Sequence, residues 1–251
     1  MLKKLSVEDV GVLREPLISG RQSPESLSFA LLLTVFLQSL VYYLEFSVAG
    51  KMTNFPYKSE ILRVHFWITA VLIILSVIYA IPFIYKRSQR VQYLMSILVT
   101  QNLVTVSCFI LGIFLVGEDS NVSEQSLVTF TKITLFLGVL LFLVTSLRFY
   151  ILLRKGKYHK GSKRDELRGK FETRSYIPAA IIGSTALVFI IQYMVRTLNI
   201  HDFRDAFITV ICFALFYTLI FILPEQLVIL YCKFRFKSFN FNKRGYLESE
   251  D

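Results

Sequence analysis

The sequence lacks the short motifs that mark the common enzyme classes. It contains no HExxH, GxSxG or GxGxxG pattern and no P-loop. Its three histidines, His65, His159 and His201, are far apart in the chain, and none belongs to a cluster with metal-ligand spacing. We therefore expect a non-catalytic protein, and we assign it no catalytic residue, no cofactor and no metal ion.

Cysteine is scarce as well. The three cysteines, Cys108, Cys212 and Cys232, lie in or beside apolar runs, and they form no CxxC pair. A free cysteine in such a setting behaves as a small hydrophobic residue. We interpret all three as packing residues, and they indicate nothing about the redox state of the compartment.

Charge is sparse in this sequence. Only 18% of the 251 residues are charged and 54% are hydrophobic, with a mean hydropathy of +0.55. A helix needs about 20 mostly apolar residues to span a bilayer. Six runs meet this requirement and leave no room for a separate soluble domain: residues 29–49, 64–85, 93–116, 128–153, 176–195 and 206–228.

None of the six runs alternates polar and apolar residues as a strand of a membrane barrel would. In hydrocarbon the backbone must satisfy its own hydrogen bonds, which leaves helices for runs of this kind. The sequence therefore predicts an all-α, polytopic integral membrane helical bundle. Its six-span domain covers residues 29–232, between an N-terminal segment (1–28) and a tail (233–251).

The positive charges predict the orientation of the bundle. Of the 28 Lys and Arg residues, 21 fall in the N-terminal segment, the second and fourth loops and the tail. Cytoplasmic loops carry the excess of basic residues, so we expect both termini in the cytoplasm (N-in and C-in). The first loop fits this pattern least well, because it carries Lys51, Lys58 and Arg63 on the outer side.

Four ionisable residues lie inside or at the edges of the predicted spans. A charge near the middle of a bilayer costs at least about 2.5 to 3.5 kcal/mol and usually needs a partner. By depth, Glu45 is level with Lys132, and Arg148 is level with Glu225. The sequence therefore suggests two cross-helix ion pairs; the alternative is that each side chain extends to its own interface.

Uncharged polar residues and one proline add further candidates. Gln101 and Asn102 lie within the third run. They either form hydrogen bonds between helices or contribute to a substrate site. Pro224 precedes Glu225 and removes a helical hydrogen bond, so the carboxylate could line a cytoplasmic cavity. We favour the simpler reading, in which the sixth span ends at Pro224 and an interfacial helix follows.

Two segments are strongly basic: the fourth loop (154–175) and the tail. In the tail, aromatic residues alternate with Lys and Arg directly after a span, as in segments that lie on anionic lipid. We therefore expect the bilayer and its anionic lipids as partners, and no nucleic acid. Small residues four apart in the fifth run also favour close helix packing, within one chain or in a homo-oligomer.

Two functions fit these features. The first is a non-catalytic protein of a bacterial envelope that gives immunity or resistance to a toxin or bacteriocin by recognising a membrane-active partner. The second is a membrane subunit of a transporter or an ABC-type export permease, with an ATPase subunit as its partner. Short loops and the lack of a processing signal favour the bacterial cell membrane as the location.

Overall fold

The computed structural model describes residues 6–118, 122–163, 166, 201–242 and 244–249. These residues are almost entirely helical, and the only strand-like contact among them is a single bridge between Phe241 and Leu247. Five helices in this part of the chain are long and apolar enough to cross a membrane. The all-α class is therefore confirmed, together with the apolar character expected of membrane-spanning helices.

The helices follow one another with short connections. A π-helix, η3, continues the first long helix, and a second π-helix, η4, lies within the third. The elements are η2 (Glu8–Arg14), α1 (Glu15–Ile18), α2 (Pro24–Leu44), η3 (Glu45–Ala49), α3 (Gly50–Met52), α4 (Lys58–Ala80), α5 (Pro82–Tyr85), α6 (Gln89–Thr100), η4 (Gln101–Val106), α7 (Ser107–Val116), α8 (Glu124–Arg154), α11 (His201–Arg235) and η5 (Lys237–Phe239).

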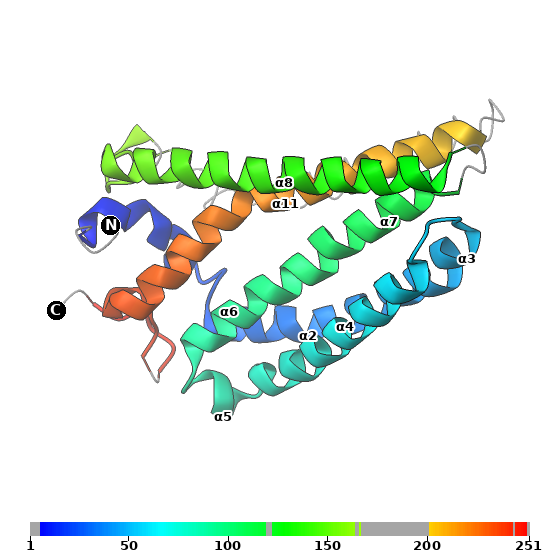
Figure 1. Cartoon of the computed structure of the whole chain (residues 1–251). Coiled ribbons are helices and arrows are strands. Elements are labelled where there is room, and N and C mark those ends of the chain that lie inside the picture. The colour runs from blue at the N-terminus through cyan, green and yellow to red at the C-terminus, as the bar shows by residue number, and fades with distance from the viewer. Residues whose placement is uncertain (1–5, 119–121, 164–165, 167–200, 243, 250–251) are drawn as a thin grey trace.

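Both ends of the described chain lie at the same end of the bundle, which we call the basal end; the opposite end, with α3, is the distal end (Figure 1). The chain runs from basal to distal in α2 and in α6–η4–α7. It runs from distal to basal in α4, α8 and α11 (Figure 1). The end of α8 and the start of α11 therefore lie at opposite ends. The predicted fifth span, 176–195, lies outside the described residues.

The helix bounds differ from the predicted spans in two informative places. The second span was expected at 64–85, but α4 begins at Lys58 and ends at Ala80. Ile81 is extended there because a following proline disfavours helical backbone. In the sixth run, α11 continues as one helix through Pro224 to Arg235. Membrane helices tolerate an internal proline where surrounding protein satisfies the freed groups, and Pro224 is buried.

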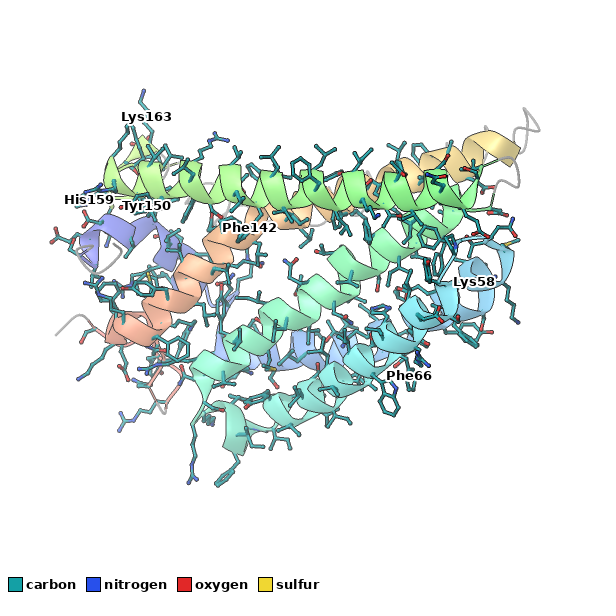
Figure 2. All side chains as sticks on the ribbon, in the orientation of Figure 1. Lys58, Phe66, Phe142, Tyr150, His159 and Lys163 are labelled. Atoms are coloured by element: carbon teal, nitrogen blue, oxygen red, sulfur yellow. The ribbon has the colours of Figure 1, made fainter. Side chains whose placement is uncertain are left out.

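Large apolar side chains cover the outside of the bundle. Trp67 on α4, Phe36 on α2 and Phe136 on α8 are each about two-thirds exposed, and Figure 2 shows side chains projecting from the outer faces of the helices. Soluble proteins do not expose apolar surface continuously along several helices. This surface is the one that lipid would cover.

Glycines bring α7 and α8 close to α11. A Cβ atom at Gly112 of α7 would lie 2.9 Å from the ring of Phe213, and one at Gly138 of α8 would lie 3.1 Å from the ring of Phe216. Two aromatic rings one turn apart on α11 thus fill the space that these glycines leave. Because these two rings pack against residues of both α7 and α8, α11 joins the two helices into one unit.

A hydrophobic cluster closes the basal end. The short N-terminal helices contribute Val10, Leu13 and Leu17, which pack with Phe239 and Phe241 of the tail. Tyr93, Phe149 and Ile229, from three of the long helices, belong to the same cluster. The segments before the first long helix and after the last one are therefore packed parts of the bundle.

The tail folds back onto the second connection of the chain. Gln89 Nε2 donates to the Phe241 carbonyl at 2.7 Å, and the Phe241 N–H donates to Gln89 Oε1 at 2.9 Å. Asn240 Nδ2 donates to the carbonyls of Lys233 and Phe236. We call this paired contact of Gln89 and Phe241 the tail clasp. Of the aromatic residues expected to lie on lipid, Phe239 and Phe241 are buried in protein, whereas Phe234 is exposed.

The tail clasp generates a test of the fold. Gln89→Ala removes both side-chain bonds to Phe241, each contributing about 1 kcal/mol. We expect the Phe241 and Asn240 amides to exchange with deuterium roughly tenfold faster, because local opening of the tail becomes easier. Hydrogen-exchange mass spectrometry in detergent measures this change. Lys86→Ala, at an exposed position nearby, is the matched control; equal exchange in both variants contradicts the clasp.

Candidate intramembrane polar site

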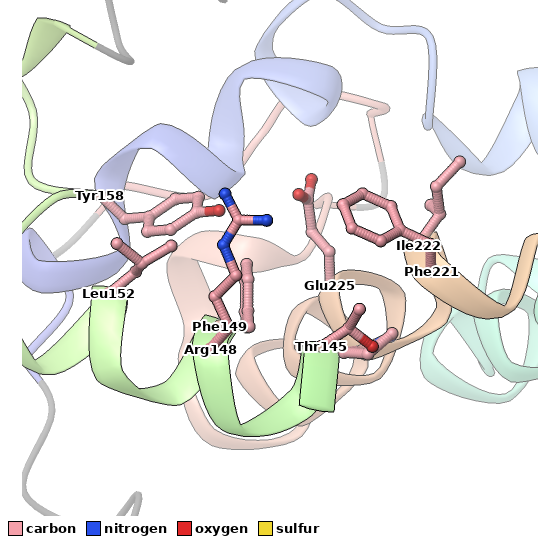
Figure 3. Close-up of a pocket in the computed structure, with 9 residues that line it drawn as sticks. Thr145, Arg148, Phe149, Leu152, Tyr158, Phe221, Ile222 and Glu225 are labelled. Atoms are coloured by element: carbon pink, nitrogen blue, oxygen red, sulfur yellow. The ribbon is translucent and has the colours of Figure 1, made fainter. Parts of the chain in front are cut away.

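Two of the predicted residues line one cavity near the basal end, between α8 and α11. Arg148 and Glu225 border a space of about 220 Å³, whose walls are otherwise mostly apolar or aromatic and include Phe149, Leu152 and Phe221. Figure 3 shows the charged ends of Arg148 and Glu225 side by side, both directed into the cavity. Pro224 belongs to the same wall. The structure thus brings together the two residues that depth alone had matched.

The other predicted pair, Glu45 with Lys132, does not form. Lys132 is exposed on α8, whereas Glu45 pairs with His65 of α4. The difference arises from which helices are neighbours, because α2, which η3 continues, packs along α4. Equal depth in the membrane therefore gave the wrong partner for this carboxylate.

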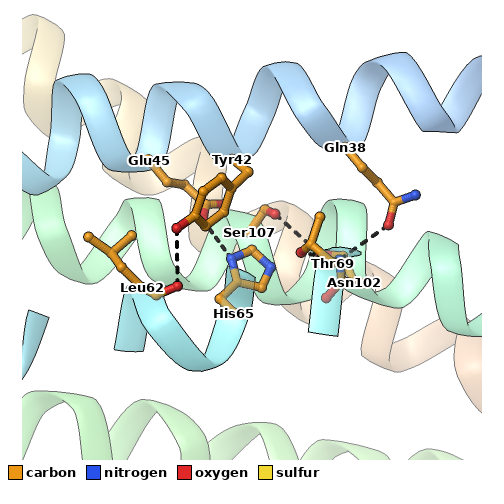
Figure 4. A network of polar contacts seen from close by, with 8 residues as sticks. All are labelled: Gln38, Tyr42, Glu45, Leu62, His65, Thr69, Asn102 and Ser107. Carbon is orange, nitrogen blue, oxygen red and sulfur yellow. Dashed lines mark hydrogen bonds and ion pairs between the residues drawn. The ribbon is translucent and has the colours of Figure 1, made fainter. Parts of the chain in front are cut away.

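Glu45 and His65 form a buried pair. Glu45 Oε2 lies 2.6 Å from His65 Nδ1, and the two side chains are 0% and 3% exposed. Tyr42, one turn before Glu45, packs its ring against the imidazole and donates from its hydroxyl to the Leu62 carbonyl (Figure 4). A carboxylate and an imidazole at this distance share one strong hydrogen bond.

Helical periodicity on α4 places His65 inside the bundle. The buried residues of α4 recur at intervals of three and four: Leu62, His65, Thr69, Leu72, Ser76 and Ala80. This spacing puts them on one face of the helix. Gln38 and Glu45, seven residues apart, stand on the facing side of α2 and η3. Polar side chains of α4 and polar side chains of α2 and η3 therefore face each other over about two turns of helix.

An amide group continues the polar site toward the middle of the bundle. Asn102 Nδ2 donates to Thr69 Oγ1 at 3.0 Å and to Gln38 Oε1 at 3.3 Å (Figure 4). The Ser107 hydroxyl donates to the Asn102 carbonyl at 3.2 Å. Three separate helices therefore meet through one asparagine, which fixes their relative positions.

Both predicted polar positions coincide with π-helices. Glu45 is the first residue of η3, and Gln101 and Asn102 begin η4. A π-helical turn accommodates an extra residue, and such turns occur frequently at functional sites. In η4, the Thr105 hydroxyl donates to Gln101 Oε1. The Ser107 hydroxyl donates to the Asn102 carbonyl, which belongs to the widened turn. The local backbone thus departs from the α-helix at the residues that carry the polar groups.

Several buried polar atoms of the site have no hydrogen-bond partner within the described part of the chain. They are Glu45 Oε1, His65 Nε2, Gln38 Nε2 and Asn102 Oδ1. An unpaired polar group in an apolar interior costs roughly 2 to 7 kcal/mol, depending on the reference state. A site that leaves four such atoms is therefore suited to a polar guest, such as water, a proton or a small solute.

The chemistry available to this site is proton exchange. A carboxylate and an imidazole in hydrogen-bond contact can pass a proton between them. Metal binding receives no support from the described residues, since no three His, Cys, Asp or Glu side chains cluster among them. We call Glu45, His65, Gln38, Thr69 and Asn102 the polar site.

Sequence reasoning missed the central role of His65 for an identifiable reason. The second span was predicted to begin at residue 64, which placed His65 at the membrane surface. Because α4 begins at Lys58, His65 lies two turns inside the helix. The three-and-four spacing with Leu62, Thr69 and Leu72 was the signal that could have found it.

No protein-family model, curated protein or solved structure matches this chain.

The buried pair generates a stability prediction. Glu45→Ala leaves the imidazole without its partner, and breaking a buried pair costs about 3 to 5 kcal/mol of unfolding free energy. We expect Glu45→Ala and His65→Ala to destabilise the protein by similar amounts. The double variant should lose much less than the sum, since no unpaired charge remains. Denaturant titration in detergent micelles measures all three.

Lys132→Ala is the control for these variants, because Lys132 is exposed on α8 and its replacement should leave stability unchanged. Strictly additive losses for Glu45→Ala and His65→Ala would show that the two side chains are not energetically coupled.

Proposed function

We propose that this protein is a proton-coupled membrane carrier whose coupling proton binds at the Glu45–His65 pair. The observation that carries the proposal is the 2.6 Å contact between two ionisable groups that are 0% and 3% exposed. Ionisable residues within membrane helices are costly, and they characteristically belong to proton relays and substrate pathways. The unpartnered Glu45 Oε1 and His65 Nε2 atoms leave both groups able to exchange a proton with a guest.

We infer six spans with both termini in the cytoplasm. The end of α8 and the start of α11 lie at opposite ends of the bundle (Figure 1), which is the arrangement that an even number of spans requires. Residues 176–195 supply an apolar run of the required length. Exposed basic residues gather at the basal end, among them Arg87, Arg154 and Lys155, and basic residues favour the cytoplasmic side.

The same basic residues support contact with anionic lipid. Lys157 and Lys160 of the fourth loop are exposed, as is Lys237 of the tail. Each basic residue near an anionic membrane surface contributes about 1 kcal/mol of attraction. We propose that these side chains hold the basal end against the cytoplasmic leaflet of the cell membrane.

The buried pair supports the second of the two functions that the sequence left open. An immunity protein recognises its toxin through surface residues, and it has no need for a carboxylate and an imidazole inside the bundle. A carrier does need such groups, since binding and release of the proton drive its cycle. The polar site therefore favours transport. The outer loop that an immunity protein would use, 117–124, is described only in part.

The cavity at Arg148 and Glu225 supports the same proposal. It lies between α8 and α11, near the basal end, and combines apolar walls with two opposite charges. Solute sites in proteins are mostly apolar with a few polar groups that orient the ligand. We propose that this cavity is where the solute enters or leaves on the cytoplasmic side.

Proteoliposomes that contain a trapped pH-sensitive dye test the carrier function. Amino acids, dipeptides, sugars, nucleosides and organic cations are added outside in turn, and internal pH is followed. We expect at least one class to move protons with the wild-type protein and none to do so with Glu45→Gln, which keeps the side-chain volume but cannot ionise. Lys132→Gln is the matched control and should behave as wild type.

Two results would count against the proposal. If Glu45→Gln retains the proton movement seen with wild type, the pair is not the coupling site. If the protein is instead purified from its native membrane with a nucleotide-hydrolysing subunit, and solute moves without protons, the permease alternative replaces the carrier.

A further inference from the structure

Two of the three cysteines meet where α7 and α11 pack together. The thiols of Cys108 on α7 and Cys212 on α11 share a hydrogen bond, in which one S–H is the weak donor and the other sulfur the weak acceptor. All three cysteines are free. In the sequence they are alike as small apolar packing residues, and only the contact between these two helices distinguishes the pair from Cys232.

The two helices approach closely beside the thiols. The ring of Phe109, the residue after Cys108, lies 6.4 Å from the ring of Phe213, the residue after Cys212. One turn along α7 from Cys108, Gly112 leaves the space that the Phe213 ring fills. A disulfide needs two Cβ atoms about 3.5 to 4.5 Å apart, and a glycine contact between helices favours short separations of this kind.

The two thiols differ in their access to small molecules. Cys108 is partly exposed, whereas Cys212 is only 6% exposed. Redox-sensing cysteines combine an accessible thiol with a second thiol that resolves the first oxidation product. Cys108 therefore has the position of the thiol that reacts first, and Cys212 has the position of the thiol that resolves it.

Cys232 lies too far away to take part in the same bond. It follows Cys212 by 20 residues in α11, which is one continuous helix. At 1.5 Å per residue the two cysteines are about 30 Å apart. The chain therefore offers one pairing within a single molecule, and Cys232 remains as an internal reference.

We propose that Cys108 and Cys212 are a peroxide-sensitive pair that forms a disulfide between α7 and α11. The Cys108 sulfur loses its proton and attacks one oxygen of a hydroperoxide, the O–O bond breaks, and water leaves if the oxidant is hydrogen peroxide. The Cys212 sulfur then attacks the resulting sulfenic acid, an S–S bond replaces the S–O bond, and a second water leaves. Two thiols and one hydrogen peroxide thus give one disulfide and two waters, and a thiol reductant reverses the reaction.

The disulfide would join two parts of the bundle that carry different polar groups. Helix α7 continues from η4, which contains Asn102, whereas α11 contains Glu225 of the basal cavity. A covalent bond holds these two helices at their present separation. Any activity that needs α11 to move against α7 stops in the oxidised protein and resumes on reduction. The formation of the bond itself does not depend on the proposed carrier function.

Thiol counting by intact-mass spectrometry tests the pair. Purified protein in detergent is treated with hydrogen peroxide, denatured and alkylated with N-ethylmaleimide. Untreated protein should take up a label on each of its three cysteines, and oxidised protein should take up a label on Cys232 alone. Dithiothreitol before alkylation should restore all the labels. We expect the pair to lose its labels at least about tenfold faster than Cys232, which is 1% exposed, because oxidation follows accessibility.

Serine variants make the result specific. Cys212→Ser should accumulate a sulfenic acid on Cys108 that dimedone traps, because no second thiol resolves it. Cys108→Ser should keep its labels on Cys212 and Cys232, since the accessible thiol is gone. Cys232→Ser is the matched control, because it removes a cysteine outside the pair, and it should form the disulfide at the wild-type rate.

Three results would overturn the proposal. The first is wild-type protein that keeps the labels of Cys108 and Cys212 under peroxide, and the second is a pair that loses them no faster than Cys232. The third is a Cys108→Ser protein in which Cys212 loses its label as fast as in wild type. If a serine variant does not fold, Cys108→Ala and Cys212→Ala replace it, because alanine places no hydroxyl in the apolar interior.

Discussion

Hydrocarbon offers no hydrogen-bond partner, and every polar group within a span must therefore find one inside the protein. The arrangement of α2, α4 and α6–η4–α7 follows from this constraint. His65 takes the carboxylate of Glu45, and Asn102 binds Gln38 and Thr69. These contacts fix three helices by directional bonds, whereas α11 is held against α7 and α8 by aromatic rings packed on glycines. The bundle thus joins α2, α4 and η4 by polar contacts, and it joins α11 to α7 and α8 largely by aromatic packing on glycines.

Hydropathy predicted the helical class and the approximate position of each described long helix, because length and apolar character are properties of a local run of residues. Hydropathy was less informative where a single proline decides whether a helix ends. Pro82 ends α4 early, since the residue before a proline avoids helical backbone, whereas Pro224 lies within a continuous α11. The two prolines have the same local chemistry, and only the surrounding packing separates them.

Several site residues were selected from the sequence, but His65 was missed and one of the two predicted pairs was wrong. Glu45, Asn102, Arg148 and Glu225 could be selected because polar groups in apolar runs are unusual. Partners depend on which helices are neighbours, and depth along a span carries no such information. Arg148 and Glu225 share a cavity because α8 and α11 are in contact, but Glu45 faces α4 and leaves Lys132 on the outside. The π-helices also have no signal in hydropathy.

The tail clasp has a consequence for how the protein is made. Gln89 and Phe241 are 152 residues apart, so at 5 to 20 residues per second the ribosome delivers the second partner roughly 8 to 30 seconds after the first. Until then the connection between α5 and α6 lacks its cover, and the basal cluster lacks Phe239 and Phe241. Closure of the clasp therefore comes late in biogenesis, and a quality-control protease could distinguish finished chains from unfinished ones by the exposed residues.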